Sequence, residues 1–285
     1  MISEFLVKPI PLWDGRLTAE LIENKLNDFK LKGILQTSNG YNTVNSYFKD
    51  NVEYPIVKYQ LNIPTKSPVF LEQPSLGYLH SFYYTHGLEP LPIGILSSEK
   101  AMDKLNAAFK VMEQVPGCFD CVTGLVKCIQ LLKNEDSEID VSYSHPEIPF
   151  SIFISLCDED CLTSDLRVCE SILHEAMHLK LTLIEEIVPI VEANSEETFY
   201  SPWRGEDRPV KGVLHGLFVF RAILDFYKVL KEKTGSLFSD EAAASIRILE
   251  IKREIEMLSE LHHCKSLTHT GRKLAIKLVQ LPNPL

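Results

Sequence analysis

The 285-residue sequence lacks the common signatures of nucleotide binding and of serine hydrolysis, because it contains no P-loop, no G-x-G-x-x-G and no G-x-S-x-G segment. An excess of basic residues is also absent, since the formal net charge is -10. A charge of this sign repels duplex nucleic acid and anionic membrane surfaces. We therefore expect no nucleic-acid partner and no membrane-surface partner.

Long apolar runs and paired cysteine motifs are likewise missing. No uncharged stretch reaches the length of a membrane span, and Glu4, Pro9 and Pro11 replace the basic head and apolar run of a secretory signal. The seven cysteines include a single C-x-x-C pair. We expect a cytoplasmic protein with reduced, buried thiols. The thiols to which this prediction applies are Cys118, Cys121, Cys128, Cys157, Cys161 and Cys169.

The pattern of apolar residues predicts a mainly α fold with a small β component, arranged as one domain over 1–285. The metal-binding helical core is expected in 141–285, and 1–140 is the less defined part, with a possible role in substrate binding. Residues 1 to about 70 are expected to form loops with one or two short strands. The predicted regular elements are a helix over 97–115 capped by Ser97 and Ser98, a helix through CVTGLVKCIQLLKN, a strand at IPFSIFISL, and helices over 163–189, 210–233 and 239–263.

Two further predictions concern the aromatic stretch before residue 92 and the core-facing side of the last long helix. The aromatic stretch between Leu71 and Pro92 contains Tyr78, His80, Phe82, Tyr83, Tyr84 and His86. It is expected to be a buried helix or strand, or else an aromatic wall for a peptide substrate. In the last long helix, the residues expected to face the core are Ile246, Leu249, Ile255, Leu258 and Leu261.

The segment LHEAMHLKLT contains H-E-x-x-H, formed by His174, Glu175 and His178. Residues four apart on a helix project from one face about a turn apart, so both imidazoles can reach one metal ion. The best candidate for a third ligand is His215, which lies on the apolar stripe of the next helix. Gly212 and Gly216 flank it and indicate a close approach to the backbone, which the metal's other ligand could provide.

The loop FYSPWRGEDRPVKG joins these two helices and carries Trp203, Arg204 and Arg208. A guanidinium can hold a carboxylate through two hydrogen bonds. Three readings fit such a centre: a zinc peptidase in which Glu175 helps to activate water, an Fe(II) oxygenase with open positions for a keto acid and oxygen, or a structural metal in a binding protein. The arginine loop favours the oxygenase, because a dicarboxylate cosubstrate needs a cationic clamp.

The segments ILHEAMHLK, FYSPWRGEDRP and GVLHGLFVF together resemble the HExxH-motif proteins of gene clusters for ribosomally made, post-translationally modified peptides. The resemblance covers about residues 143 to 280, including SHPEIPFSIFISL and SLTHTGRKLAIKL. It implies a non-haem Fe(II), 2-oxoglutarate-dependent enzyme that uses O2 to hydroxylate a peptide side chain, commonly at the β carbon.

Carried onto this chain, the resemblance implies His174, His178 and His215 as iron ligands, and Arg204 or Arg208 with Trp203 at the cosubstrate. Glu175 would then order the site rather than act as a general base. The familiar iron pattern has a carboxylate as third ligand, so Asp225 and Glu206 are possible substitutes for a histidine.

The resulting expectation is an Fe(II)/2-oxoglutarate-dependent peptide hydroxylase that acts on a precursor peptide. The alternative is a zinc-dependent metallopeptidase that cleaves a precursor or leader peptide. The sequence leaves open which peptide residue is modified and the oligomeric state.

Overall fold

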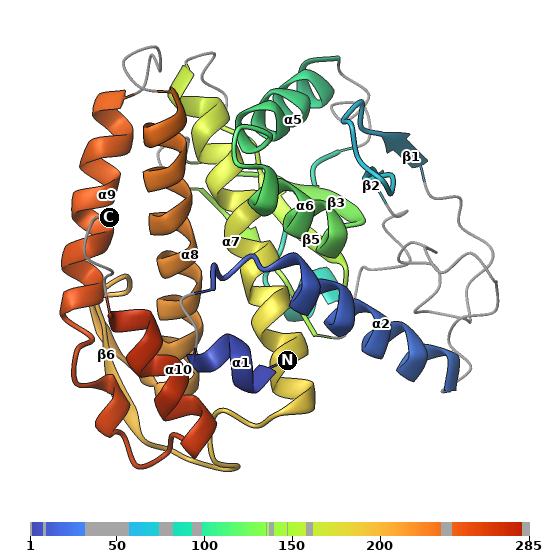
Figure 1. Cartoon of the computed structure of the whole chain (residues 1–285). Coiled ribbons are helices and arrows are strands. Elements are labelled where there is room, and N and C mark those ends of the chain that lie inside the picture. Colours follow the sequence, from blue (N-terminus) through green and yellow to red (C-terminus); the bar gives the residue numbers. More distant parts are fainter. Residues whose placement is uncertain are drawn as a thin grey trace.

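A computed structural model of the chain describes residues 2–7, 10–31, 57–73, 82–92, 99–134, 136, 140–146, 148–157, 162–234 and 241–280. Helices make up most of these residues, and the strands form one small mixed sheet and one hairpin (Figure 1). The predicted class, mainly α with a small β component, is therefore confirmed. Within the described ranges, no helix has the length and apolarity that crossing a membrane requires.

The N-terminal part contains two helices that the sequence reading missed. Helix α1 spans Ile2–Val7 and helix α2 spans Gly15–Leu31, where loops were expected. Leu17, Leu21 and Phe29 are buried along one face of α2. This spacing is helical, and the first turn is capped by the Asp14 carboxylate, which accepts a hydrogen bond from the Leu17 amide at 2.8 Å. Residues 32–56 lie outside the described ranges.

The main sheet has five strands in the order β1-β2-β3-β5-β4. The pairs β2/β3 and β3/β5 are parallel, whereas β1/β2 and β4/β5 are antiparallel. The strands are β1 Val57–Gln60, β2 Phe70–Gln73, β3 Cys128–Leu132, β4 Ser142–Tyr143 and β5 Ser151–Ser155. The strands predicted in the first 70 residues and at IPFSIFISL are confirmed by β1 and β5.

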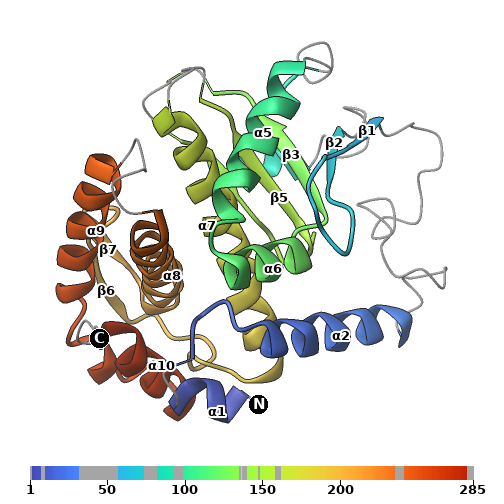
Figure 2. The same cartoon turned by 45° about the horizontal axis from the view of Figure 1, so that its top comes forward.

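The two central strands are buried on both faces. Ile152 and Ile154 of β5 belong to the main core, on the side where Figure 2 shows α5, α6 and α7. Phe153 points to the opposite side and packs with Tyr83 and Ile148 in a smaller cluster. Strands covered on both faces have continuous apolar sequences rather than alternating ones, which explains the runs CIQLL and SIFIS.

Of the two helices predicted between residues 97 and 134, the first is confirmed and the second is only partly correct. Helix α5 covers Glu99–Met112 as predicted, whereas the proposed caps Ser97 and Ser98 lie outside the described residues. Helix α6 spans only Pro116–Leu125, and the chain then becomes strand β3. The predicted helix through CVTGLVKCIQLLKN was therefore wrong beyond Leu125, because the run CIQLL completes the parallel sheet between β2 and β5.

Helix α7, Leu162–Ile187, is the centre of the molecule and carries the HExxH segment. It packs against β5 and against α2, α5, α6 and α8. The hairpin of β6, Thr198–Ser201, and β7, Glu206–Pro209, leads into α8, Val210–Thr234. The predicted helices at 163–189 and 210–233 are confirmed. Helix α10, His269–Val279, packs against α1 and α8, so the first and last helices of the described chain lie side by side (Figure 1).

Helix α9, Glu241–Glu256, packs on α8, and a short 3-10 turn, η3, follows at Leu261–His263. The predicted core face was partly wrong. Ile246 and Leu249 are 58% and 54% exposed, because α9 turns the stripe of Ala244, Ile248, Ile251 and Ile255 toward α8. Ile255, Leu258 and Leu261 are buried as predicted.

The face of α7 that points toward α2 and α6 holds a fully buried lysine. Lys180 Nζ donates hydrogen bonds to the Asp14 carbonyl at 3.1 Å and to Thr18 Oγ1 at 2.8 Å. Cys121 Sγ lies 3.8 Å from the same nitrogen. A buried ammonium is tolerated only with such partners, so these contacts tie α7 to the N-terminal helices.

Candidate metal and cosubstrate site

The three predicted histidines meet between α7 and α8. His174 and His178 lie one turn apart on α7, and their Nε2 atoms are 3.2 Å apart. Helix α8 packs along α7 and brings His215 Nδ1 to 3.4 Å from His178 Nδ1. The His178 and His215 rings are stacked with centroids 5.6 Å apart. Two successive helices thus bring together the two histidines predicted from their four-residue spacing and the one predicted from its apolar stripe.

The imidazoles form a row rather than a converging triad. His178 stands in the middle and faces His174 through Nε2 and His215 through Nδ1. An ion bonded to His178 Nε2 would lie beside His174, whereas His215 approaches the other nitrogen of the ring. Accordingly, among the residues that the structure describes, no group of three or more His, Cys, Asp or Glu side chains is arranged to hold a metal ion.

The pair His174 and His178 nevertheless fits two neighbouring ligands of one ion. Metal–nitrogen bonds of about 2.1 Å at roughly 90–110° place the two nitrogens roughly 3.0–3.4 Å apart. The observed separation of 3.2 Å falls in this range. The arrangement therefore offers two ligand positions ready for a metal and a third histidine close by.

Burial keeps these imidazoles uncharged. It lowers the pKa of His174 to about 4, although the Glu175 carboxylate acts in the opposite direction. Burial, followed by the neighbouring His215 and Arg204, lowers the pKa of His178 to about 3. Metal ligation requires neutral imidazole, so no proton has to be removed from these two rings near pH 7.

A carboxylate holds the outer nitrogen of His215. Glu185 Oε2 lies 3.0 Å from His215 Nε2 and 3.3 Å from Lys211 Nζ. Burial acts to raise the pKa of Glu185, but the hydrogen bonds and charges of His215 and Lys211 outweigh it and lower that pKa. Glu185 is therefore ionised, and it fixes the orientation of the His215 ring in the way that carboxylates fix metal-ligating histidines.

Glu175 is sealed into the wall of the site by strand β4 and the residue that follows it. Its Oε1 accepts a hydrogen bond from Ser142 Oγ and its Oε2 accepts one from Ser144 Oγ, each at 2.6 Å. The residue is 3% exposed, and Oε1 lies 3.9 Å from His174 Nε2. Both carboxylate oxygens are therefore engaged, and the immediate effect of Glu175 is to fix the β4 segment against α7.

The histidines open into a cavity of about 590 Å³, called the histidine cavity below. Its wall also includes Ser142, His145, Thr182, Glu185, Arg204 and Lys211. Gly205 has a φ of 68°, a conformation that favours glycine, and it closes the tight turn that presents Arg204. Within the described part of the chain, no carboxylate pairs with Arg204, so its guanidinium is available to a ligand.

The other candidates of the loop lie elsewhere. Arg208 pairs with Glu206 at 3.0 Å on the exposed hairpin, and neither lines the cavity. Asp225 is bound by Arg221 one turn away on α8, where it also does not line the cavity. The structure thus brings Arg204 to the histidines and leaves Arg208, Glu206 and Asp225 apart from them.

Trp203 does not line the histidine cavity but packs against Phe220 of α8. Its ring stacks on Phe220 with centroids 4.6 Å apart, and its Nε1 donates a hydrogen bond to Glu254 of α9 at 2.9 Å. A Cβ at Gly216 would lie 2.7 Å from this indole, so the close approach expected at Gly216 is made by Trp203 and not by a metal ligand. No neighbour lies within 4 Å of a Cβ built at Gly212.

The aromatic segment before residue 92 reaches the far wall of the same cavity. Tyr78 and His80 lie outside the described residues. Tyr83 is buried, Tyr84 is 83% exposed, and His86 Nδ1 lies 2.8 Å from the hydroxyl of Tyr143, which lines the histidine cavity. One part of the segment is therefore core, and another part supports the cavity wall through Tyr143.

The buried thiols behave as expected from the sequence. The described cysteines are free and buried, namely Cys118, Cys121, Cys128, Cys157, Cys169 and Cys264. Cys161 lies outside the described residues. Burial raises the pKa of Cys118 and Cys169, so these thiols are protonated and inert near neutral pH.

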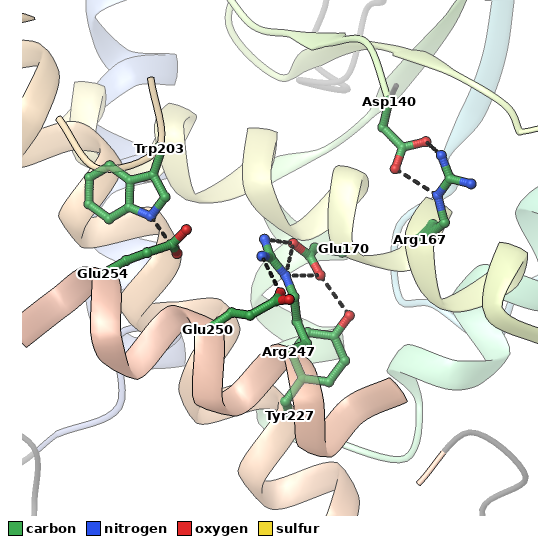
Figure 3. A network of polar contacts seen from close by, with 8 residues as sticks. All are labelled: Asp140, Arg167, Glu170, Trp203, Tyr227, Arg247, Glu250 and Glu254. Atoms are coloured by element: carbon green, nitrogen blue, oxygen red, sulfur yellow. Dashed lines mark hydrogen bonds and ion pairs between the residues drawn. The ribbon is translucent and has the colours of Figure 1, made fainter. Parts of the chain in front are cut away.

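A second cavity of about 540 Å³, called the aromatic cavity below, adjoins the first. Both include Ser142 and His174 in their walls. Its remaining wall is formed by Leu166, Phe220, Tyr227, Ile246 and a group of charged residues drawn in Figure 3. Sequence reasoning missed this cavity, because its polar residues are spread over three helices and the segment before β4.

No model of a known protein family matches the chain, and a search of curated proteins finds no significant match. The functional argument therefore depends on the residues of this chain and their geometry.

Proposed function

We propose that the protein is a non-haem Fe(II)- and 2-oxoglutarate-dependent dioxygenase that hydroxylates a side chain of a ribosomally synthesised precursor peptide. The observation that carries this proposal is Arg204, a guanidinium without a carboxylate partner among the described residues, beside neutral imidazoles in one cavity. A dicarboxylate keto acid can satisfy both, with one end at a metal and the other at Arg204.

In this proposal His174 and His178 hold iron through Nε2, and His215 is the third ligand. The row of imidazoles requires His215 to turn toward the ion, and Glu185 is the group that controls this turn, because it holds the other nitrogen of the ring. Carboxylates behind ligating histidines commonly set ring orientation and basicity. The donor set thus fits a divalent transition metal, with two positions preformed.

When bound, the iron and cosubstrate would supply the reaction R–H + O2 + 2-oxoglutarate → R–OH + succinate + CO2. Arg204 would bind the far carboxylate of the cosubstrate and fix its orientation. The apolar Leu179 and Phe220 lie around the histidines and limit the access of water. The resemblance to HExxH peptide-modification proteins favours the β carbon of the side chain as the position of hydroxylation.

A zinc peptidase is the second candidate, because Glu175 lines the histidine cavity close to His174. A general base must reach the metal-bound water. Both oxygens of Glu175 accept serine hydroxyls and the side chain is almost fully enclosed, which supports the hydroxylase over the peptidase.

The test is the formation of succinate from 2-oxoglutarate by the Fe(II)-loaded protein in air, compared between wild type and Glu175→Gln. We expect succinate in both proteins, because the amide keeps one hydrogen bond to β4 and takes no part in proton transfer. Absence of succinate in the wild type, together with Zn(II)-dependent peptide cleavage that Glu175→Gln abolishes, would replace the hydroxylase by the peptidase.

A further inference from the structure

The aromatic cavity lies next to the proposed metal position. His174 and Ser142 line both cavities, and the His174 ring meets the Phe220 ring edge to face with centroids 5.4 Å apart. A group that fills the aromatic cavity therefore contacts the same imidazole that would hold the metal. A substrate group in the aromatic cavity would therefore have a C–H bond beside the proposed metal position.

The charged groups around the aromatic cavity are already paired with one another (Figure 3). Glu170 accepts hydrogen bonds from Arg247 Nη2 at 2.7 Å and from the Tyr227 hydroxyl at 2.6 Å. Arg167 donates two hydrogen bonds to Asp140, each at 3.0 Å. Both guanidinium groups in the described wall of this cavity, Arg167 and Arg247, are therefore bound by carboxylates, in contrast to Arg204 in the histidine cavity.

The surfaces between these ion pairs are apolar. Phe220 forms the floor, with the Trp203 ring stacked on it and the Arg247 guanidinium 5.6 Å from its centroid. Leu166 and Ile246 complete the wall, and Ile246 is 58% exposed at the rim. Aromatic and aliphatic side chains bind well to such platforms because they bury apolar area without leaving a charge unpaired.

We propose that the aromatic cavity binds a neutral, apolar or aromatic side chain of the substrate peptide and places it beside His174. This assignment depends on the proposed function, and it gives each cavity its own ligand. The dicarboxylate binds Arg204 in the histidine cavity, and the peptide side chain packs on Phe220 in the aromatic cavity. The exposed Ile246 and Leu249 of α9 extend the apolar surface outward from the rim, where neighbouring peptide residues can pack.

The experiment uses Trp203 as a reporter, since its ring stacks on the floor of the cavity. Trp13, the only other tryptophan, is replaced by Phe in every protein tested. Trp203 emission is followed while N-acetyl-phenylalaninamide or N-acetyl-leucinamide is added, with N-acetyl-glutamic acid amide and N-acetyl-lysinamide as charged probes. Ala243→Phe fills the cavity from α9, and Ala242→Phe, at the exposed neighbouring position, is the matched control.

We expect saturable binding of the two apolar probes and about tenfold or more weaker binding in Ala243→Phe than in Ala242→Phe. In anaerobic NMR titrations, Fe(II) should broaden the proton signals of the bound apolar probe and Zn(II) should not, because the probe lies beside the metal. Equal affinity in the two variants, no apolar binding to the wild type, preference for a charged probe, or no Fe(II)-dependent broadening would each overturn the assignment.

A separate readout distinguishes this failure from failure of the proposed function. Chelation of 2-oxoglutarate by Fe(II) gives a visible absorption band, and that band belongs to the histidine cavity. We expect Ala243→Phe to keep the band while it loses the apolar probes. A band with no apolar binding would overturn the side-chain assignment alone, whereas no band in the wild type would overturn the hydroxylase.

Discussion

The histidine cavity and the aromatic cavity share His174 and Ser142, yet their charges are organised differently. In the first, Arg204 has no carboxylate partner among the described residues, and burial lowers the pKa of His174 and of His178. In the second, Arg247 and Arg167 are bound by Glu170 and Asp140. An unpaired cation near the proposed metal ligands suits an anionic chelator, whereas paired charges around Phe220 suit an apolar group.

The largest predicted effect is the loss of Fe(II) affinity when His178, the middle histidine of the row, is replaced. His178→Ala should lower the Fe(II) affinity by at least about 100-fold, because His178 is adjacent to both other histidines. His263→Ala, an exposed histidine of η3, should leave the affinity unchanged. Metal titration monitored by calorimetry under argon gives both values. Equal affinities of the two variants would contradict the site.

The second effect concerns the unpaired cation. Arg204→Ala should weaken 2-oxoglutarate binding by roughly 10- to 100-fold, the loss expected for a charge-assisted two-point contact. Arg208→Ala should change it by less than about twofold, since Arg208 already pairs with Glu206. The measurement is a titration of 2-oxoglutarate into Fe(II)-loaded protein. A larger loss in Arg208→Ala would reverse the assignment of the two arginines.

The third prediction concerns a substitution that should give the aromatic cavity affinity for an anion, as proposed for the histidine cavity. Glu170→Gln should remove the shorter of the two ion pairs of Arg247 and leave only its 3.4 Å contact with Glu250, so that the aromatic cavity gains affinity for N-acetyl-glutamic acid amide. The same change should lower the free energy of unfolding by about 2 kcal/mol, since Arg247 and Tyr227 lose an ionised partner. Trp203 emission and urea unfolding measure the two effects. Unchanged probe preference would show that charge pairing does not set the selectivity of this cavity.

Much of the fold, and the approach of His174 to His178, could be predicted from the sequence because local patterns define them. Helical spacing fixed α7 and α8, and the four-residue interval predicted the contact of His174 with His178. The strand β3 was missed because a short, fully buried apolar run fits a helix or a strand equally well, and only pairing with β2 and β5 decides between them.

The parts that could not be predicted depend on side-chain pairings that the sequence does not specify. Glu206 lies two residues from both Arg204 and Arg208, and only the structure shows that it pairs with Arg208. Glu185 follows the HExxH segment on the same helix, but its role depends on the approach of His215 from α8. Glu175 is held by Ser142, in a strand of only two residues, and by Ser144, just after that strand. So short a strand gives no signal in the sequence.

The smallest predicted effect is a change in the free energy of unfolding, caused by replacing Lys180 on the opposite face of α7, away from both cavities. Burial lowers the pKa of Lys180 below its ordinary value of 10.5. The unfolded chain therefore binds this proton more tightly, and the wild type gains stability as the pH rises from the lowered pKa toward 10.5. Lys180→Met removes the group, so it should be more stable than the wild type by about 1 kcal/mol at pH 7, with a smaller difference near pH 10.

Urea unfolding at the two pH values tests this prediction, and a difference that does not depend on pH would contradict it. Fe(II) binding should be the same in Lys180→Met and the wild type, because Lys180 Nζ contacts Asp14, Thr18 and Cys121, which line neither cavity.

The most direct test of the metal and cosubstrate site is the visible spectrum of the protein loaded anaerobically with Fe(II) and 2-oxoglutarate. The proposal predicts a charge-transfer band in the wild type that is lost in His178→Ala and in His215→Ala, and that needs far more 2-oxoglutarate in Arg204→Ala. A wild-type protein that binds Fe(II) without developing the band, or a band that persists in His178→Ala, would contradict it.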